Sequence, residues 1–569
     1  MATVVETPAV EKVWLKSYPP GIPAEANVDE FANIREILQR SCQRFAALPA
    51  FSNMGATIDY ATLDRLSRDF GAWLQNVAGL QRGDRVALMM PNLLQYPVAI
   101  FGVLRAGFVV VNCNPLYTPR ELEHQLNDSG AVAIVILENF ANTLAQVVTR
   151  TPVRSIVVTA IGDLLGFPKG PITTFAVRHV KKLVKPYALP GAVRYRAALA
   201  EGARHKLAEP PLTHDDIAFL QYTGGTTGVS KGAMLTHGNL VANLQQVSAW
   251  ISKGLQEGRE IAITALPLYH IFALSGSCLT NMKIGTHNVL ITNPRDLPTF
   301  VKTLSKYRFS SISGVNTLFN ALMNTPGFAD LDFSGLKLSL GGGMAVQRAV
   351  AERWKKITGR PLLEAYGLTE TSPGACINPI VEGFEYNGTA GLPIPSTEIT
   401  IRDDDGNLLP LGSTGEICIK GPQVMKGYWN RPDETAKVMT PDGAFRTGDI
   451  GLMTPQGYVK IVDRKKDMIV VSGFKVFPNE VEDVVAMLPD VGEVCAVAYP
   501  DEHSGEVVRV VIVRKDPSLT KEQVVEHCKK NLTGYKVPKI VEFWKELPKT
   551  NVGKVLRREV KDSAVKDAA

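Results

Sequence analysis

The sequence lacks the features that mark secreted and zinc-binding proteins. Its 569 residues contain seven scattered cysteines, an odd number, and no Cys-x-x-Cys pair. A disulfide framework or a zinc ribbon is therefore disfavoured, and a reducing compartment is expected. The first 16 residues carry Glu6 and Glu11 and have no apolar core of the kind found in secretion signals. We therefore expect a cytoplasmic protein.

Charge and hydropathy disfavour two further classes. The 62 basic and 56 acidic side chains leave a net charge of +6, which is too dilute to indicate a nucleic-acid partner. No stretch of about 20 residues stays apolar without a charge, so no membrane-spanning helix is predicted. The apolar run 96–112 is interrupted by Arg105, and such runs are typical of buried strands and core helices.

The order of apolar runs predicts an α/β fold. Residues 84–113 read as an apolar run, a helical stretch and a second apolar run, which is a βαβ pattern. The pattern returns at 131–137, 155–159 and 309–319. Such alternation predicts parallel-type sheets covered by helices. Short strands separated by Gly, Pro and Asp turns at 388–462 add a smaller β-rich unit.

A charged segment, DRKKD at 463–467, precedes a compact α+β pattern. We place a hinge here, between a large N-terminal domain, 1–462, and a smaller, mobile C-terminal domain, 468–569. The alternative is a solvated turn inside one domain.

The strongest local signal is the run QYTGGTTGVSKG at 221–232, which follows the apolar strand IAFL. Its glycines permit tight turns that bring backbone N–H groups toward an anion, while its threonines and Lys231 add donors and a positive charge. A Walker A loop is excluded because GxxxxGK[ST] does not match. The GxSxG match around Ser230 does not indicate a serine hydrolase, because flexible residues separate Ser230 from the strand and a second strand follows.

Further motifs follow in order along the chain. They are YGLTET at 366–371, RTGD at 446–449, DRKKD at 463–467, SGFK at 472–475 and PKTNVGK at 548–554. Together with the glycine-rich loop they resemble the motifs of the adenylate-forming (AMP-binding) superfamily. The segment 463–482 is most similar to bacterial long-chain fatty-acid–CoA ligases. Ser230, Gly238, Ala444 and Arg446 depart from the residues common in this family.

The resemblance implies two half-reactions. A carboxylate attacks the α-phosphorus of ATP to give acyl-AMP and pyrophosphate, and the thiolate of CoA then displaces AMP. Because the first step joins two anions, cations must screen them. Mg²⁺ is the implied cofactor, with Thr223 and Glu370 as its ligands, and Lys231 would bind the β- and γ-phosphates. The implied phosphate loop is Gly224, Gly225, Thr226, Thr227 and Gly228.

The resemblance also assigns the nucleoside site. Asp449 would accept hydrogen bonds from both ribose hydroxyls, since a carboxylate has two acceptor oxygens. Arg464 would donate to ribose or phosphate, and Tyr366 would stack on adenine. The other implied residues of the ATP/AMP site are Gly343, Glu364, Ala365, Gly367 and Thr369.

Lys554 is implied as the cation that neutralises the reacting carboxylate during adenylation. Because it lies beyond the hinge, the small domain must turn toward the large one for this step. Gly473 and Lys475 would line a channel for CoA after the domain turns away. Lys466 is the hinge candidate, with an ordinary solvated charge as the alternative.

His270 and Tyr269 are implied to lie near the acyl carboxylate, although a structural histidine is the alternative for His270. Segments 270–274 and 315–322 are expected to line an acyl tunnel. Each buried methylene contributes about 0.8 kcal/mol, so a long dry tunnel favours long chains.

The predicted function is therefore a long-chain fatty-acid–CoA ligase. The alternatives are a medium-chain or aromatic acyl-CoA synthetase, and a fatty-acyl-AMP ligase that loads a carrier protein. A non-catalytic binder is disfavoured because Lys231, Glu370, Asp449 and Lys554 are all present.

One segment, 162–196, is strongly basic, with seven Lys or Arg residues and one acid, Asp163. Apolar residues are interleaved: Leu164, Leu165, Phe167, Phe175, Val177 and Val180. Such a stretch suits peripheral contact with an anionic lipid surface, here the inner face of the cell membrane, and a solvated helix face is the alternative. The sequence does not determine the oligomeric state, and a homodimer stays open.

Overall fold

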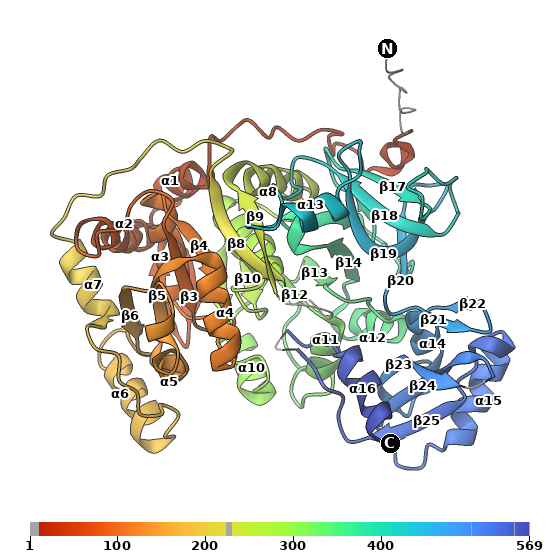
Figure 1. Cartoon of the computed structure of the whole chain (residues 1–569). Helices are drawn as coiled ribbons and strands as arrows, with labels where there is room; N and C mark the ends of the chain where they lie inside the picture. The colour runs from red at the N-terminus through yellow and green to blue at the C-terminus, as the bar shows by residue number, and fades with distance from the viewer. Residues whose placement is uncertain (1–10, 224–229, 502, 551, 568–569) are drawn as a thin grey trace.

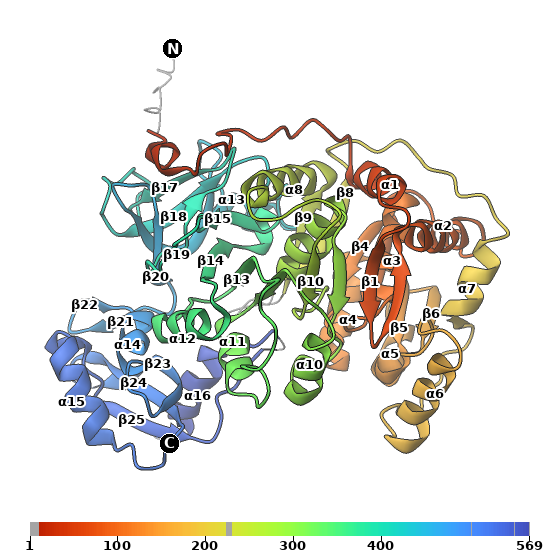
Figure 2. The same ribbon diagram turned by 180° about the vertical axis from the view of Figure 1, so that it is seen from behind.

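The computed structural model describes residues 11–223, 230–501, 503–550 and 552–567. Figures 1 and 2 show a large body that ends with strand β20 (Val459–Arg464) and a small body that follows it. Within these residues the large body contains three sheets and the small body a fourth. The predicted α/β fold class, with parallel-type sheets and a β-rich unit, is confirmed.

The first sheet of the large body has seven strands and is mostly parallel. Strands β4 and β5 are rich in Val and Ile and buried along nearly their whole length, as parallel strands covered on both faces require. The strands, in spatial order, are β7 (Val193–Arg194), β6 (Ser155–Thr159), β5 (Ala131–Leu137), β3 (Arg85–Met89), β4 (Val109–Asn112), β8 (Ile217–Thr223) and β9 (Lys231–Thr236). The helices of this part are α1 (Ile34–Arg44), α2 (Tyr60–Asn76), α3 (Gln95–Arg105), α4 (Pro119–Ser129), α5 (Ala141–Ala145), α6 (Lys169–Phe175) and α7 (Tyr195–Gly202).

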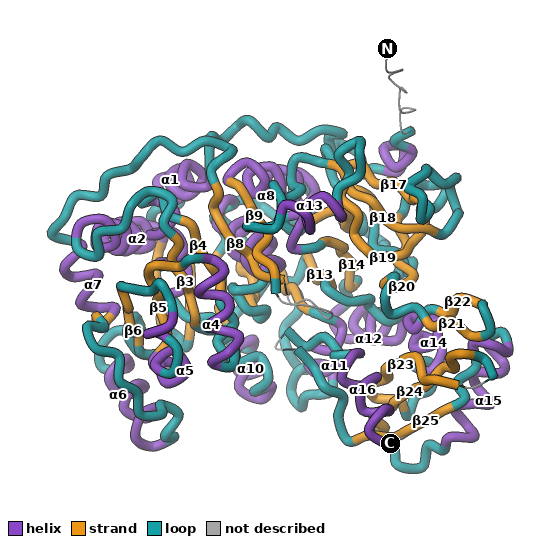
Figure 3. Tube along the Cα trace, in the orientation of Figure 1, coloured by secondary structure: helices purple, strands orange, loops and turns teal. Residues whose placement is uncertain are grey.

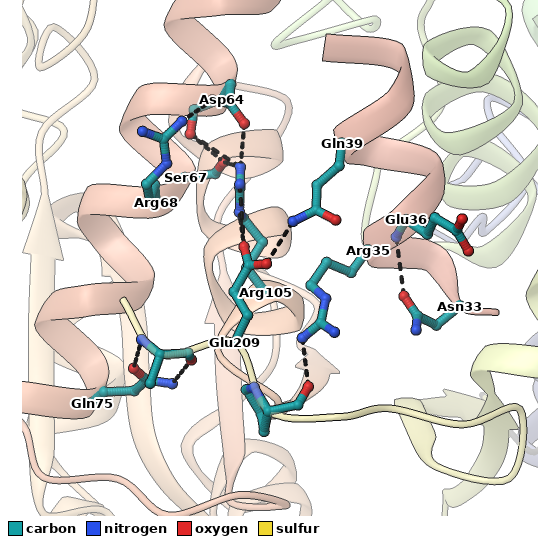
Figure 4. Close-up of polar contacts among 12 residues, drawn as sticks. Asn33, Arg35, Glu36, Gln39, Asp64, Ser67, Arg68, Gln75, Arg105 and Glu209 are labelled. Atoms are coloured by element: carbon teal, nitrogen blue, oxygen red, sulfur yellow. Dashed lines mark hydrogen bonds and ion pairs between the residues drawn. The ribbon is translucent and has the colours of Figure 1, made fainter. Parts of the chain in front are cut away.

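Helix α3 ends at Arg105, the charge that interrupts the apolar run 96–112. Arg105 is only 4% exposed, and its guanidinium donates to Asp64 at 2.5 Å and lies 3.3 Å from Glu209. Figure 4 shows these carboxylates and Ser67 gathered around it. Because a buried charge is stable only when it is paired and hydrogen-bonded, this cluster ties α3 to α2 and to the segment that leads to β8.

The second sheet has nine strands, parallel at its centre and antiparallel toward both edges. A continuous apolar core, containing Val86 of β3, Leu244 of α8 and Leu290 of β11, joins it to the first sheet. The strands, in spatial order, are β16 (Leu392–Pro393), β15 (Gly374–Ile377), β14 (Leu362–Gly367), β13 (Leu338–Gly342), β12 (Ser311–Gly314), β10 (Ile261–Thr264), β11 (His287–Leu290), β1 (Pro49–Asn53) and β2 (Ala56–Asp59). The helices are α8 (His237–Ile251), a π-helix at Phe272–Leu279, α9 (Thr280–Lys283), α10 (Leu297–Leu304), α11 (Asn316–Met323) and α12 (Arg348–Thr358).

The β-rich unit predicted at 388–462 is a four-stranded antiparallel sheet. Its strands are β17 (Glu398–Arg402), β18 (Gly415–Lys420), β19 (Phe445–Met453) and β20, with helix α13 (Pro432–Val438) before β19. Figure 3 shows that strands and loops dominate here, whereas helices and strands alternate in the rest of the large body.

The small body contains five strands around its own apolar core, which includes Ile469, Val485 and Val510. Its strands are β21 (Ile469–Val471), β22 (Phe474–Val476), β23 (Val491–Asp501), β24 (Gly505–Arg514) and β25 (Ile540–Trp544), and its helices are α14 (Pro478–Val485), α15 (Lys521–Asn531) and α16 (Arg557–Asp567). Among the residues described, no helix has both the length and the apolar character needed to cross a membrane.

The segment between the two bodies is shorter than the proposed hinge 463–467. Asp463 and Arg464 are the last residues of β20, and residues 465–467 form the turn before β21. The Asp463 carboxylate accepts a hydrogen bond from the backbone N–H of Asn479 at 2.8 Å. The backbone N–H of Lys465 donates to the carbonyl of Gly448 at 3.0 Å. Residues 465–468 thus lie between the end of β20 and the start of β21.

Candidate active site

A cavity of about 2000 Å³ lies where the large and small bodies meet. Most of the predicted site residues line it: Thr223, His270, Gly343, Glu364, Ala365, Tyr366, Gly367, Thr369, Glu370, Asp449, Arg464, Lys466 and Lys554. Lys231, Gly473 and Lys475 do not line it. The loop residues Gly224, Gly225, Thr226, Thr227 and Gly228 lie outside the described residues.

Lys554 belongs to the small body but extends into the large one. Its Cε lies 3.1 Å from the point that a Cβ atom would occupy on Gly343. A turn fixes its backbone, because its N–H donates to the Thr550 hydroxyl at 3.1 Å and its carbonyl accepts from the Thr550 N–H at 2.7 Å. Thr317 of α11 donates to the carbonyl of Gly553 at 2.9 Å. The described arrangement therefore places Lys554 in the site.

Charges around Lys554 set its protonation. Burial, together with the neighbouring Arg464 cation, lowers the pKa of Lys554 to about 8, although Asp449 opposes both effects. Lys554 can still be charged when a carboxylate binds beside it. Its charged form is less favourable here than in water, because the side chain is buried beside another cation.

His270 is neutral and its tautomer is defined. Burial, followed by the charge of Lys554, lowers the pKa of His270 to about 3. Its Nδ1 accepts a hydrogen bond from the backbone N–H of Phe272 at 3.3 Å. The proton of a neutral imidazole must then lie on Nε2. His270 can therefore donate a single hydrogen bond into the cavity.

Asp449 forms the centre of the predicted ribose site. The hydroxyl of Tyr366 donates to its Oδ2 at 2.7 Å, and Arg464 Nε lies 3.3 Å from its Oδ1. Asp449 pairs across β19 and β20 with Arg464, so strand register brings the two side chains together. Tyr366 is thus a hydrogen-bond donor to the carboxylate that the ribose would use.

Glu370 lies at the floor of the cavity, on the short turn after β14. Its Oε1 accepts a hydrogen bond from Tyr428 at 2.7 Å, and burial raises the pKa of its carboxyl group. Thr223, at the end of β8, lines the same cavity. A carboxylate and a hydroxyl are hard oxygen donors of the kind that Mg²⁺ accepts beside water and phosphate oxygens. The donor set therefore fits the implied cation.

Lys231 lies outside the cavity lining and is paired within the large body. Its ammonium group forms an ion pair with Glu434 of α13 and lies 5.2 Å from the centre of the Tyr428 ring. Lys231 and the neighbouring Lys437 lower the pKa of Glu434 to about 2. To bind phosphate oxygens, Lys231 would have to exchange this carboxylate for them.

An apolar arm of the cavity runs between α8 and the second sheet. The apolar residues that line it come from α8 and the loop after it and from strands β10, β12 and β13. They are Val247, Ile251, Leu255, Ala262, Ile263, Ile312, Leu338 and Leu340. From the two segments expected to line an acyl tunnel, His270, Ile271, Phe272, Asn316, Thr317 and Asn320 are also present. The arm opens beside Gly342, where an added Cβ would lie 3.0 Å from the ring of Phe272.

Several residues of this site were not predicted from sequence. Glu434 and Tyr428 lie about 200 residues from Lys231 in the chain and carry no motif of their own. The α8 residues occur every fourth position, a spacing that any core-facing helix shows. The sequence signal that could have indicated them is Asn243, a polar residue in that stripe. In the structure its amide hydrogen-bonds both the N–H and the carbonyl of Gly374.

Gly473 and Lys475 lie at the exposed β21–β22 turn, away from the cavity. Gly473 has φ +84° and no atom lies within 4 Å of its missing Cβ. A channel role for this turn would require another orientation of the small body.

The basic segment 162–196 forms α6 and its flanks, which project from the end of the large body opposite the small one (Figure 1). Leu165 and Val177, expected among the lipid-facing residues, are buried in the core. The exposed apolar side chains are instead Phe167 (91%), Ile172 (63%), Phe175 (61%), Val180 (70%) and Leu183 (54%). Arg178 and Arg194 pair with the buried Glu138, whereas Lys169, Lys181, Lys182 and Lys185 have no ion pair within the described residues.

Comparison with known proteins shows the family to which the chain belongs. Residues 38–429 match the family model described as AMP-binding enzyme, and residues 480–554 match the AMP-binding enzyme C-terminal domain. A long-chain-fatty-acid–CoA ligase of Escherichia coli O6:H1 is 57% identical over 555 residues, covering 98% of this chain and 99% of its own. One of Yersinia pestis is 56% identical over 557 residues, with the same two coverages. The crystal structure of an anthranilate CoA ligase in complex with anthranoyl-AMP has the same fold, with a TM-score of 0.83 over 95% of this chain and 98% of its own, at 22% identity.

Gly343→Val should displace Lys554 from the cavity, because the new side chain would occupy the place of the lysine's end. Overpacking of this kind costs about 1 kcal/mol or more, so labelling of Lys554 by an amine-reactive reagent should rise about fivefold. Mass spectrometry of the labelled protein measures this rise.

Gly359→Val is the matched control, since Gly359 has a similar φ of +71° and no atom within 4 Å of its missing Cβ. Equal labelling of Lys554 in both variants would contradict the contact with Gly343.

Proposed function

Because this chain belongs to the AMP-binding enzyme family, we propose that it activates a long-chain fatty acid with ATP and transfers the acyl group to CoA. The products are acyl-CoA, AMP and pyrophosphate. The observation that carries this proposal is the cavity itself, which Lys554, Asp449 and Glu370 line together with the apolar residues of α8 and of β10, β12 and β13. The arm suits an alkyl chain, and the charged end suits the reaction of a carboxylate with a nucleotide.

The first half-reaction requires the fatty-acid carboxylate to approach the α-phosphate of ATP. Lys554 neutralises the charge on both groups, and His270 donates its Nε2 proton in a hydrogen bond to one of them. Asp449 holds the ribose hydroxyls, and Arg464 lies between ribose and phosphate. Lys231 releases Glu434 and binds the phosphates that leave as pyrophosphate.

Thr223 and Glu370 would hold Mg²⁺, which supplies further positive charge to the phosphate oxygens when it is bound. Tyr428 keeps Glu370 in place for this role through the hydrogen bond to its Oε1.

The second half-reaction needs access for the thiol of CoA to the acyl carbonyl. Lys554 occupies the region beside Gly343 in the described arrangement. We infer that the small domain turns about Lys465–Asp467, with Lys466 in the hinge, so that Lys554 leaves and Gly473 and Lys475 approach the cavity. In this motion the large domain, 1–462, and the small domain, 468–569, move relative to each other about the segment 463–467 that connects them.

Chain-length dependence tests the substrate. Each methylene buried in the arm contributes about 0.8 kcal/mol, so kcat/KM should increase severalfold for each added carbon up to the end of the arm, with a maximum among acids of about 12 to 18 carbons. Pyrophosphate release with acids of increasing length, with and without CoA, measures this. A maximum at acetate or an aromatic acid would contradict the long-chain substrate, and turnover that needs an acyl carrier protein in place of CoA would identify a carrier-loading ligase.

The two half-reactions should respond to different variants. Lys554→Ala should slow formation of acyl-AMP by several kcal/mol of barrier, because a key electrostatic group is lost, and should leave thioester formation from supplied acyl-AMP nearly unchanged. Gly473→Leu should slow thioester formation, because it fills the proposed CoA channel, and should leave acyl-AMP formation nearly unchanged. Single-turnover kinetics of each half-reaction measures both effects.

Two controls match these variants. Lys539→Ala removes an exposed lysine of the small body. Gly505→Leu imposes similar backbone strain at φ +76° in open space. If Lys554→Ala slows both half-reactions equally, the two-conformation mechanism is wrong for this protein.

We further propose that the protein works in the cytoplasm and binds the inner face of the cell membrane through 162–196. The exposed apolar residues of this segment would insert among the headgroups, while the four unpaired lysines contact anionic lipid. This surface includes the side chains most exposed among the large apolar residues of the described chain.

Vesicles that contain anionic lipid should bind the protein at low salt, at about 1 kcal/mol for each lysine near the surface. Combined substitution of Lys181, Lys182 and Lys185 by Glu should abolish co-sedimentation, and Phe167→Ser with Phe175→Ser should weaken it without changing its dependence on salt. Leu411→Ser is the matched control, because Leu411 is an exposed leucine on the β-rich unit. Leu164→Ser is unsuitable because Leu164 is part-buried. Absence of binding at low salt would overturn this proposal.

A further inference from the structure

The apolar arm ends between two loops. Residues 252–260 connect α8 to β10, and residues 378–391 connect β15 to β16. Ile251 at the end of α8, Leu255 from the first loop and Ile380 from the second line the cavity together with Leu338 of β13, with which they form one apolar cluster. Val381, the next residue after Ile380, is 44% exposed. The second loop therefore reaches the protein surface one residue after Ile380.

The length of the arm follows from the elements that form it. Leu338 and Gly342 are four residues apart on β13, which spans about 13 Å at ~3.3 Å per residue. On the facing helix, Asn243 and Ile251 are eight residues apart, which spans about 12 Å at ~1.5 Å per residue. An extended alkyl chain built from bonds of about 1.5 Å advances ~1.3 Å per carbon. About ten carbons therefore reach from the mouth at Gly342 to Leu338, and longer chains reach Ile380.

Ile380 is held at this end by a close contact with Gly254. A Cβ atom on Gly254 would lie 2.9 Å from Cγ2 of Ile380 and 3.8 Å from its Cδ1. The φ of Gly254 is not positive, so a larger residue would fit the backbone there. Its side chain would instead collide with Ile380. Ile380 also packs against the apolar cluster of Ile251, Leu255 and Leu338. The side chain is thus seated on the wall of the arm and faces its interior.

We propose that Ile380, seated against Gly254, is the closed end of the acyl tunnel and determines the longest fatty acid that the protein accepts. Chains that end before Leu338 do not touch Ile380 and do not sense it. Chains that extend more than about ten carbons beyond Gly342, by the rise per carbon used above, pass Leu338 and must pack against Ile380. This inference rests on the proposed function and adds the residue that sets its upper chain-length limit.

The experiment compares kcat/KM for saturated acids from 8 to ~20 carbons in the wild type, Ile380→Ala and Ile380→Phe. Ile380→Ala should move the upper limit about two or three carbons higher, because three side-chain carbons are removed. Ile380→Phe should lower kcat/KM for the longest accepted acids at least about tenfold, the size of an overpacking effect. Both variants should keep wild-type activity with the 8-carbon acid, which shows that they are folded and catalytically intact.

Val381→Ala is the matched control, since it alters the neighbouring exposed side chain and should leave the profile unchanged. A wild type that does not use long-chain acids would contradict the proposed function itself. A wild type that uses them, with profiles that coincide in Ile380→Ala and Ile380→Phe, would overturn only the assignment of Ile380. Equal loss of activity at every chain length would also overturn it, because the effect would then not depend on contact with the chain end.

Discussion

The approach of two anions inside a partly dry cavity is the constraint on which the rest of this structure depends. The cation that meets them, Lys554, comes from a separate body and lies beside Arg464, whose positive charge helps to lower its pKa. A lysine kept permanently in that position would carry the electrostatic cost in every state of the enzyme. In the proposed motion, the small body that supplies Lys554 turns away after the first step. The cost is then restricted to the step that needs the charge, and the same space becomes free for the thiol.

The other charged groups of the site are already paired before any nucleotide arrives. Glu434 pairs with Lys231, Tyr366 and Arg464 contact Asp449, and Tyr428 donates to Glu370. Such partners fix the side chains in orientations close to those they need, so little reorganisation follows when the substrate binds. They also make nucleotide binding an exchange of one partner for another, which tempers affinity and allows the products to leave.

Much of the fold and of the site could be predicted from the sequence. The βαβ pattern at 84–113 and the turn-rich pattern at 388–462 follow from local periodicity, which tertiary packing did not override. Most of the described motif residues, which lie up to hundreds of positions apart, line one cavity, whereas Lys231, Gly473 and Lys475 do not.

What the sequence could not provide depends on three-dimensional neighbours. The helical periodicity of 162–183 is short and interrupted, so Leu165 and Val177 could not be distinguished from Ile172 and Leu183 as buried or exposed. The end of the apolar arm is formed where two loops meet, and neither loop has a pattern that indicates the other. The pairing of Asp463 and Arg464 within β20 could not be predicted for a similar reason, because strand register is set by the partner strand.

The position of Arg464 has a mechanical consequence. This nucleotide-site residue ends β20 and is followed at once by the turn at 465–467, so the proposed pivot lies beside the ribose site. In any rotation about a pivot, displacement grows with distance from the axis. Arg464, on the last strand of the large body, would barely move, whereas Lys554 belongs to the small body and would be carried away with it. AMP could then stay bound in a site that keeps its shape through both half-reactions while the small body turns.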